Sequence, residues 1–193
     1  MTIPRATIAF AVMSVAIACD RAENASTRDT SVAAPAQGST SGARPTTDAL
    51  TDTGFGAVRI GEPVAQLNAR ARILSPSLAS LSKGCEYAKV EGVPDSLVVM
   101  VEDGVVARVD VHTHAISTRE GARIGDSESR IHDLYGARVT VTPHKYTDGH
   151  YLTVKPADAR DTTHLIVFET GHDTVVTFRA GKRPQVQYVE GCA

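Results

Sequence analysis

The chain has 193 residues, with 20 lysines and arginines against 22 aspartates and glutamates, a formal net charge of −2 and a hydrophobic content of 42%. No apolar run approaches the roughly 20 residues that a transmembrane helix needs, and the balanced charge argues against a dedicated nucleic-acid-binding protein. The length predicts one domain, or two small ones, once any targeting segment is removed.

Residues 1–18 are typical of a signal peptide. Arg5 forms a short positive region, and the stretch from residue 6 to residue 18 is apolar but too short to span a membrane. The last residues, Ala16-Ile17-Ala18-Cys19, resemble a bacterial lipobox in which Ala16 replaces the usual leucine. We therefore expect Cys19 to carry lipid and to anchor the chain in a membrane. The alternative is an ordinary secreted protein that is cut nearby, with Cys19 a spare thiol.

The segment 19–51 is predicted to be a disordered tether behind the lipid. It consists almost entirely of small and polar residues, and Val32 and Leu50 are the exceptions that could be buried. A flexible chain of this length has a typical span on the order of 30 Å. The expected location is the cell envelope, facing the periplasm. Asp20 resembles an inner-membrane retention signal, which favours the inner membrane weakly and leaves the choice of membrane open.

The two remaining cysteines support export. Cys85 and Cys192 are an even pair in a chain expected to reach an oxidising compartment, so we predict a disulfide between them. Such a bridge would pin the C-terminus. The alternative, a metal site that uses both cysteines, lacks a CxxC motif or a nearby histidine pattern.

The rest of the chain, 52–193, is predicted to be a folded domain built from a tandem repeat. Three strings recur in the same order: Arg59–Glu62 and Arg123–Asp126, then Tyr87–Val90 and Tyr151–Val154, then Val101–Gly104 and Phe168–Gly171. The first two pairs have the same spacing, and the spacing of the third is slightly longer. Short strings in a common order and at similar spacing indicate two copies of one supersecondary unit. The units would span residues 54–114 and 119–193.

In the first unit a helix is expected to begin with Pro63 at its first helical position, where a missing N–H costs nothing. Its buried side would carry Val64, Leu67 and Ala71. Residues 73–83 are ambiguous between a helix end and a loop. Strands are predicted over 86–90, 97–101 and 105–111, with a tight hairpin turn at Asp103-Gly104.

In the second unit Asp126 or Ser127 can cap a helix that Gly136 ends. Strands are predicted over 139–142, 165–168 and 174–178, in the order in which they follow the helix. Each unit therefore reads as one helix with about three antiparallel strands. The predicted fold class is α+β, with the two helix-plus-sheet units packed as one compact domain.

This pattern of Ile-Gly, a capping residue, a short helix, strands and a hairpin resembles the tandem repeat of the β-lactamase inhibitor protein. It is also similar to the small outer-membrane assembly lipoproteins of the SmpA/OmlA type. The likeness covers residues 54–193 in outline. In addition, the chain resembles an uncharacterised bacterial lipoprotein group whose domain ends in Tyr-Val-Glu-Gly-Cys, here Tyr188 to Cys192. These resemblances imply a helix-on-sheet fold and supply no catalytic residues.

The best metal candidate is the string Asp110-Val111-His112-Thr113-His114. On a strand, Asp110, His112 and His114 would share one face and could present a carboxylate and two imidazoles to a divalent ion. In the simpler interpretation Val109 and Val111 point into the core, and the polar residues between them face water. His144 and His150 form a second, weaker candidate pair.

Candidates for catalysis are few. The sequence contains neither a G-x-S-x-G elbow nor a P-loop, and the predicted disulfide removes the thiolates. Glu102, Asp103 and Glu169 are expected at solvated hairpin tips, where a general acid would lack a pocket to perturb its pKa. We therefore expect no enzyme activity and no cofactor.

Binding remains as the favoured function. Tyr87, Tyr146 and Tyr151 are candidate anchors for a partner, since tyrosine is enriched where binding energy concentrates. Tyr87 and Tyr151 occupy equivalent repeat positions, so a shared packing role is the alternative. The leading hypothesis is a lipid-anchored, non-enzymatic protein that binds another envelope protein as a scaffold or assembly accessory. The alternatives are an inhibitor of a periplasmic or extracellular hydrolase, and a metal-binding protein or metal-dependent enzyme that uses the histidine strand.

Overall fold

The computed structural model describes residues 49–193. The predicted signal peptide 1–18, the lipidation site Cys19 and residues 20–48 of the predicted tether lie outside the described residues. The end of the segment predicted as tether belongs to the folded domain, since Leu50 is fully buried in the core and its N–H donates to the Ser117 carbonyl at 2.9 Å. Within the described part, no helix is both long and apolar enough to cross a membrane.

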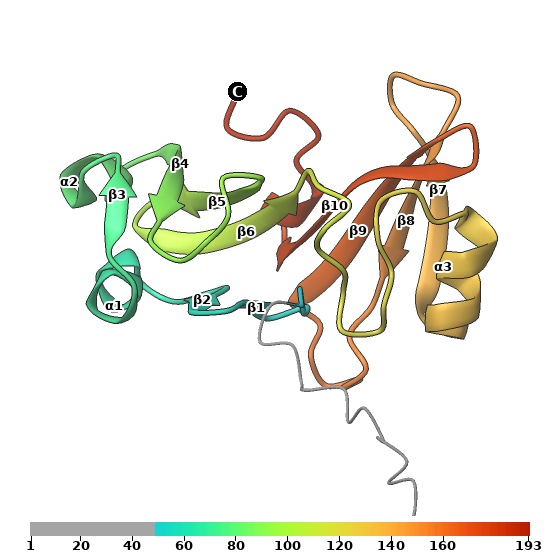
Figure 1. Cartoon of the computed structure of the whole chain (residues 1–193), viewed down its shortest axis with the longest axis horizontal. Coiled ribbons are helices and arrows are strands. Elements are labelled where there is room, and N and C mark those ends of the chain that lie inside the picture. Colours follow the sequence, from blue (N-terminus) through green and yellow to red (C-terminus); the bar gives the residue numbers. More distant parts are fainter. Residues whose placement is uncertain (1–48) are drawn as a thin grey trace, which may run out of the picture. The chain divides into compact units, whose positions relative to one another are not determined.

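The elements form two similar series along the chain (Figure 1). The first consists of the short strands β1 (Gly54–Phe55) and β2 (Val58–Arg59), helix α1 (Val64–Arg70), β3 (Ile73–Ser75), the one-turn helix α2 (Leu78–Leu81), β4 (Cys85–Val90), β5 (Leu97–Glu102) and β6 (Val105–Val111). The second consists of α3 (Glu128–Tyr135), the 3₁₀ turn η1 (Gly136–Arg138), β7 (Val139–Pro143), β8 (His150–Val154), β9 (His164–Gly171), β10 (Thr174–Lys182) and the 3₁₀ turn η2 (Gln185–Gln187).

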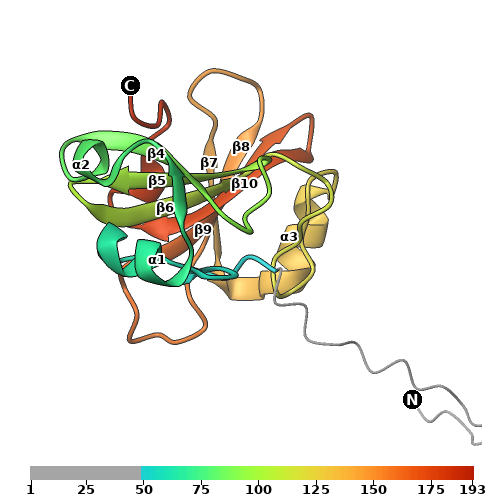
Figure 2. The same ribbon diagram turned by 60° about the vertical axis from the view of Figure 1, so that its left-hand side comes forward.

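All strands from β3 to β10 belong to one antiparallel sheet. Their order is β3-β4-β5-β6-β10-β9-β8-β7, so the last strand of each series lies in the middle and the two halves mirror each other outwards. The sheet is therefore continuous across both units, which the sequence left open. Figure 2 shows that the sheet is strongly twisted between its two ends. The α+β class with two tandem units in one compact domain is confirmed.

Equivalent backbone hydrogen bonds fix the correspondence between the units. The N–H groups of Gly61 and Gly125 donate to the carbonyls of Val106 (2.7 Å) and Val175 (2.9 Å), respectively. In both units an acidic side chain, Glu62 or Asp126, accepts a hydrogen bond from the backbone three residues earlier. The first pair of matching strings thus marks the same turn in the same fold.

The third expected repeat match is wrong by two positions. The β5–β6 turn at Asp103-Gly104 and the β9–β10 turn at His172-Asp173 are equivalent, and both have positive φ at each position. Their spacing is larger than the matching strings implied, because the β8–β9 connection is longer than the β4–β5 connection. As a result Glu169 corresponds to Met100, not to Glu102.

Each unit contains four strands of the main sheet instead of the expected three. The ambiguous residues 73–83 form the additional strand β3 and helix α2, and Ser77 caps α2 by accepting a hydrogen bond from the Ser80 N–H. Pro63 occupies the cap position of α1 and not the first helical position, since its ψ of 137° is extended. Ser127 caps α3 and Gly136 ends it, as predicted.

Alternation along the strands separates two faces of the sheet. One face carries the main core, in which Val99 pairs with Val109 and Phe168 pairs with Phe178. Helices α1 and α3 cover this face through buried side chains that include Leu67 and Ile131. The prediction that Val109 and Val111 point into the core is therefore confirmed.

The predicted disulfide joins Cys85 at the start of β4 to Cys192. It links positions separated by 107 residues and fixes the C-terminal segment to the side of the sheet that the helices leave uncovered (Figure 1). A crosslink across so long a loop restricts the unfolded chain strongly.

Replacement of both Cys85 and Cys192 by serine should lower the free energy of unfolding by about 4 kcal/mol, because the unfolded chain regains its loop-closure entropy. Urea unfolding followed by circular dichroism measures the change. The natural chain kept in dithiothreitol is the matched control and should lose the same amount. A loss below about 1 kcal/mol in both samples would contradict the prediction.

Candidate functional site

The face of the sheet turned away from α1 and α3, here called the open face, carries charged side chains in strand interiors. Strand pairing sets Asp110 of β6 directly opposite Arg179 of β10 at the centre of the sheet. The neighbours on this face are Arg108, Val98, Met100, Tyr87, Tyr151, Leu165, Val167, Glu169 and Thr177. Arg108, Asp110 and Arg179 are all buried.

Residues 183–193, here called the C-terminal strap, lie across this face. The Arg108 guanidinium donates through Nη1 to the carbonyls of Gln185 (3.1 Å) and Tyr188 (2.8 Å). The Arg179 Nε donates to the carbonyl of Val186 at 2.7 Å. Val186 itself packs in a small apolar cluster with Leu165 and Val167. The strap is thus held by two arginines and by apolar contact, in addition to the disulfide.

Two ion pairs balance the buried charges. The Arg108 Nε lies 2.9 Å from the Asp110 carboxylate, and Arg179 forms a hydrogen-bonded ion pair with Glu169. A buried charge is tolerated when its partner and hydrogen bonds replace water. Here each arginine has one carboxylate and at least one strap carbonyl, so the centre of the open face is electrically neutral.

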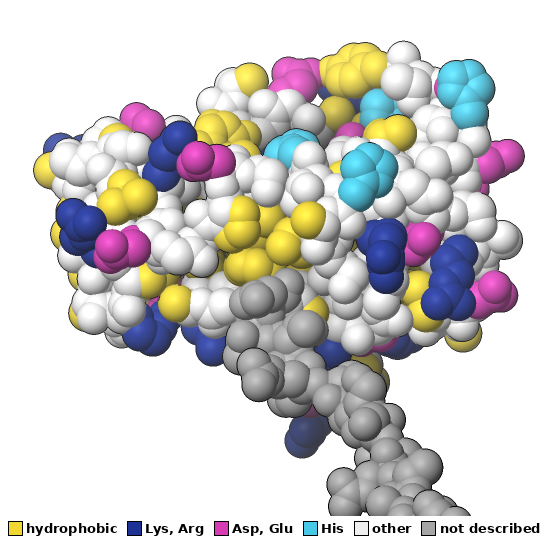
Figure 3. Space-filling view, in the orientation of Figure 1, with side chains coloured by type: hydrophobic (Ala, Val, Ile, Leu, Met, Phe, Trp, Pro, Cys, Tyr) yellow, Lys and Arg dark blue, Asp and Glu magenta, His cyan; other side chains and the backbone are white. Residues whose placement is uncertain are grey.

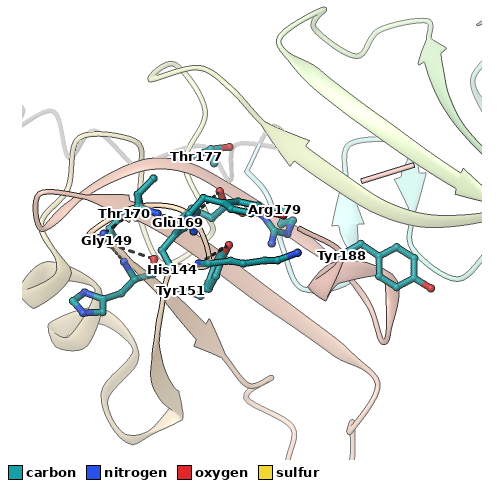
Figure 4. Close-up of polar contacts among 12 residues, drawn as sticks. His144, Gly149, Tyr151, Glu169, Thr170, Thr177, Arg179 and Tyr188 are labelled. Carbon is teal, nitrogen blue, oxygen red and sulfur yellow. Dashed lines mark hydrogen bonds and ion pairs between the residues drawn. The ribbon is translucent and has the colours of Figure 1, made fainter. Parts of the chain in front are cut away.

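His144 and Tyr151 extend this network towards β8, as Figure 4 shows. The His144 Nδ1 accepts hydrogen bonds from the N–H groups of Tyr146 (3.1 Å) and Thr147 (3.2 Å). The proton of a neutral ring therefore sits on Nε2, which faces Glu169 at 3.6 Å. The ring also stacks on Tyr151, with centroids 4.4 Å apart.

A cleft of about 480 Å³ lies between the open face and strap residues 189–191. Its walls include Tyr87, Arg108, Asp110, Glu169 and Arg179. The volume falls within the range of small-ligand and side-chain pockets. The cleft can hold a polar group of a partner next to paired charges.

The loop between β7 and β8 reaches the strap at the edge of this cleft. Tyr146 donates a hydrogen bond to Glu190, and the Lys145 ammonium lies 3.3 Å from the same carboxylate. These two contacts hold the pKa of Glu190 below its usual range. The strap is thereby attached to both halves of the sheet.

The structure does not gather the three metal candidates into one ligand cluster. Asp110 pairs with Arg108, and His112 lines the same cleft. Strand β6 ends at Val111, before both histidines. The His112 Nδ1 lies 3.4 Å from the Thr177 hydroxyl, and the His114 Nδ1 lies 3.1 Å from the Ile124 carbonyl. Among residues 49–193 the cluster that could hold a metal ion is a different one, formed by Glu128, His150 and Asp173.

The three candidate tyrosines do converge on the strap and the open face. Tyr87 accepts a hydrogen bond from the Cys192 N–H (3.2 Å), and Tyr146 bonds Glu190. Tyr87 and Tyr151 are structurally equivalent, since their strand partners Met100 and Glu169 correspond. Tyr87 and Tyr146 remain 40% and 60% exposed.

Several residues that line the cleft were not identified from the sequence. Glu169 was expected at a solvated hairpin tip but lies inside β9 and pairs with buried Arg179. Arg108 was not singled out. The available signal was a charge at an alternate position of a valine-rich strand, as in Val-Ala-Arg-Val-Asp-Val, which indicates a polar second face.

Comparisons with known proteins found a solved structure that aligns with much of this chain. It is described as the uncharacterized protein yfeY from Escherichia coli, and it aligns with a TM-score of 0.42 and 15% sequence identity, covering 70% of this chain and 99% of that chain. No protein-family model and no curated protein sequence matches the chain. A similarity at this level assigns no function, so the function has to be inferred from this chain's own residues.

Substitution of Asp110 by alanine should lower the free energy of unfolding by about 3 kcal/mol, because it leaves the buried Arg108 guanidinium without its carboxylate. The matched control is Asp95→Ala, which removes an exposed ion pair with Lys89 and should cost less than about 1 kcal/mol. Urea denaturation of both variants measures the difference. Equal losses would show that the Asp110 pair contributes no more than a surface pair.

Proposed function

We propose that this protein is a lipid-anchored, non-enzymatic cell-envelope protein that binds another envelope protein through the open face of its sheet. The observation that carries the proposal is the cleft beneath the strap, where buried ion pairs lie beside the exposed Tyr87. The exposed Tyr146 contacts Glu190 at the edge of the cleft. The helix-covered face is occupied by the protein's own core. The open face, in contrast, provides a cleft and exposed aromatic side chains that a partner can contact.

The anchor is supported by the N-terminal sequence. A positive residue, a short apolar stretch and small residues before Cys19 match a lipoprotein signal. The polar segment after Cys19 would let the domain stand away from the bilayer, by a distance on the order of 30 Å. A disulfide within the folded domain suits an oxidising compartment.

The chemistry of the cleft supports binding rather than catalysis. Its carboxylates and guanidinium groups are already engaged in ion pairs and in hydrogen bonds to strap carbonyls. Such fixed charges orient a partner's polar groups and disfavour wrong partners. Tyr87 and Tyr146 flank them with exposed aromatic surface, which can contribute apolar contact and a hydroxyl at the same place.

The anchor is tested by Cys19→Ser in a Gram-negative host. The natural chain should fractionate with membranes and carry a lipid-sized mass increment at its N-terminus, whereas the variant should lose both, because serine offers no thiol for the lipid. Membrane fractionation and mass spectrometry provide the readouts. Asp20→Ser serves as the control for sorting, since it should keep the lipid whichever membrane it reaches. A variant Cys19→Ser that remains in the membrane pellet would overturn the anchor.

The partner is tested by chemical crosslinking in intact cells that express the full chain with a C-terminal tag. We expect one recurrent envelope protein with the natural chain and its loss with Tyr87→Lys, since a charge there would disrupt the aromatic contact. Val141→Lys is the matched control, because Val141 is equally exposed (39%) but lies on the side of β7 that faces away from the cleft.

Two outcomes would contradict the partner proposal. One is recovery of the protein alone from its native host. The other is equal recovery of the partner with both lysine variants at equal folding stability. If the captured protein is a hydrolase whose activity falls on binding, the role is inhibition, and if its activity is unchanged, the role is that of an assembly accessory.

A further inference from the structure

Three potential metal ligands from distant parts of the chain converge at one end of the second unit. They are Glu128, the first residue of α3, His150, the first residue of β8, and Asp173 in the β9–β10 turn. One ligand atom from each lies within 4.8 Å of the other two. The His150 Nδ1 lies 2.8 Å from the Glu128 Oε1.

We propose that these three residues form a binding site for a divalent late transition-metal ion, with Zn²⁺ as the best fit. One imidazole and two carboxylates are a donor set that such ions accept, and affinity rises towards the end of the first transition row. Zn–N and Zn–O bonds of about 2.1 Å place donor atoms roughly 3.4 Å apart in a tetrahedron. The ligand atoms lie within 4.8 Å of one another without an ion, so binding would draw them somewhat closer.

The scaffold holds the ligands in place before any ion arrives. The backbone N–H of Glu128 donates to the Asp173 carbonyl at 3.0 Å, which ties the helix to the turn. The Thr170 hydroxyl donates to the Glu128 Oε1 (2.5 Å) and accepts from the His150 N–H (2.8 Å). Gly149 fixes the start of β8 against β9, since a Cβ there would lie 1.8 Å from the Thr170 carbonyl oxygen.

Thr170 therefore acts as a positioning residue for two ligands. A metal ion would take the place of the hydrogen bond between the His150 Nδ1 and Glu128, and the threonine hydroxyl would continue to orient the carboxylate. Outer hydrogen bonds of this kind typically tune metal affinity by about 10- to 100-fold.

Further potential metal ligands lie beside the cluster, in the β7–β8 loop and in the β9–β10 turn. Asp148 precedes His150 by two residues, His172 precedes Asp173, and these two side chains form an ion pair at 3.5 Å. In the view of Figure 3, exposed histidine side chains lie apart from one another over the middle and right-hand part of the molecule. Either residue, or water, can complete the coordination of an ion held by the first three ligands.

Comparison with the first unit indicates that the fold does not need this cluster. The positions equivalent to Glu128, His150 and Asp173 are Val64, Glu86 and Gly104. In particular, the Val64 N–H donates to the Gly104 carbonyl as the Glu128 N–H donates to the Asp173 carbonyl. A structural role would be expected in both units, so its restriction to one unit favours a ligand.

The test is a zinc titration of the full chain, purified in detergent and stripped with EDTA. Isothermal titration should show one Zn²⁺ per chain, and zinc should raise the melting temperature. Co²⁺, used as a spectroscopic probe, should give visible bands of a site with nitrogen and oxygen ligands. His150→Ala and Asp173→Asn should each weaken zinc binding by at least about tenfold, and Thr170→Val by about tenfold.

The matched control is His164→Ala, because His164 forms a similar pair with Asp161 (2.7 Å) that belongs to no three-ligand group among residues 49–193. It should leave zinc binding unchanged. Asp173→Asn changes an exposed turn residue, so it keeps the test meaningful if His150→Ala fails to fold. The absence of stoichiometric binding at high micromolar zinc, or equal binding by Asp173→Asn and the natural chain, would overturn the proposal.

Discussion

The pairing of β6 with β10 is the interaction on which the rest of the molecule depends. It joins the two units into one sheet and places Asp110 directly opposite Arg179. These two residues are equivalent in the repeat, so the approximate twofold axis that relates the two units passes between them. We call this β6–β10 junction the seam. On the helix-covered face of the sheet its residues are apolar and fully buried, and on the open face they are charged. A slip of one residue would carry the charges into the core, so the two-residue period of the strands fixes the register.

The charges at the seam also decide how the open face is covered. Each unit contributes one neutral pair, Arg108 with Asp110 and Arg179 with Glu169, so the seam forms without net charge. Each guanidinium still has donors to spare, and strap carbonyls accept them. Since a buried donor without an acceptor is costly, the arginines position the strap in addition to the disulfide. The cleft exists because the strap crosses the face without filling it.

Features with local causes could be predicted from the sequence. The fold class, the core valines at alternate positions, the caps of α3 and the disulfide each follow from residues close together in the chain or from simple counting. The additional strand of the first unit, β3, could not be predicted, because it is short and its pairing with β4 depends on tertiary context. In the second unit the strand without a prediction was β8, whereas β7, the counterpart of β3, was predicted. The predicted repeat also placed Glu169 at the wrong position. The β8–β9 connection is longer than the β4–β5 connection, and the sequence contains no pattern that reveals the extra residues.

The candidate site was predicted only in part, for a physical reason. A charged side chain in a strand can face water or a covering segment, and the sequence of that strand does not distinguish the two. Arg108 and Arg179 receive their acceptors from Gln185, Val186 and Tyr188 in the strap, which for Arg108 lies far along the chain. The role of the three tyrosines as partner anchors stays a prediction. The structure does not gather Asp110, His112 and His114 into one ligand cluster, because β6 ends before His112.

Internal repetition offers a way to separate fold from function without any second sequence. Positions that make the same contact in both units, such as Gly61 and Gly125, serve the shared architecture. Where equivalent positions carry side chains of different charge or polarity, the shared fold does not determine the residue. Such differences fall at the seam, where Asp110 corresponds to Arg179, and at the α3 end of the second unit. The specific chemistry of this protein is therefore expected where its two halves meet, in a cleft to which the first unit contributes Tyr87 and Arg108, and at the α3 end of the second unit.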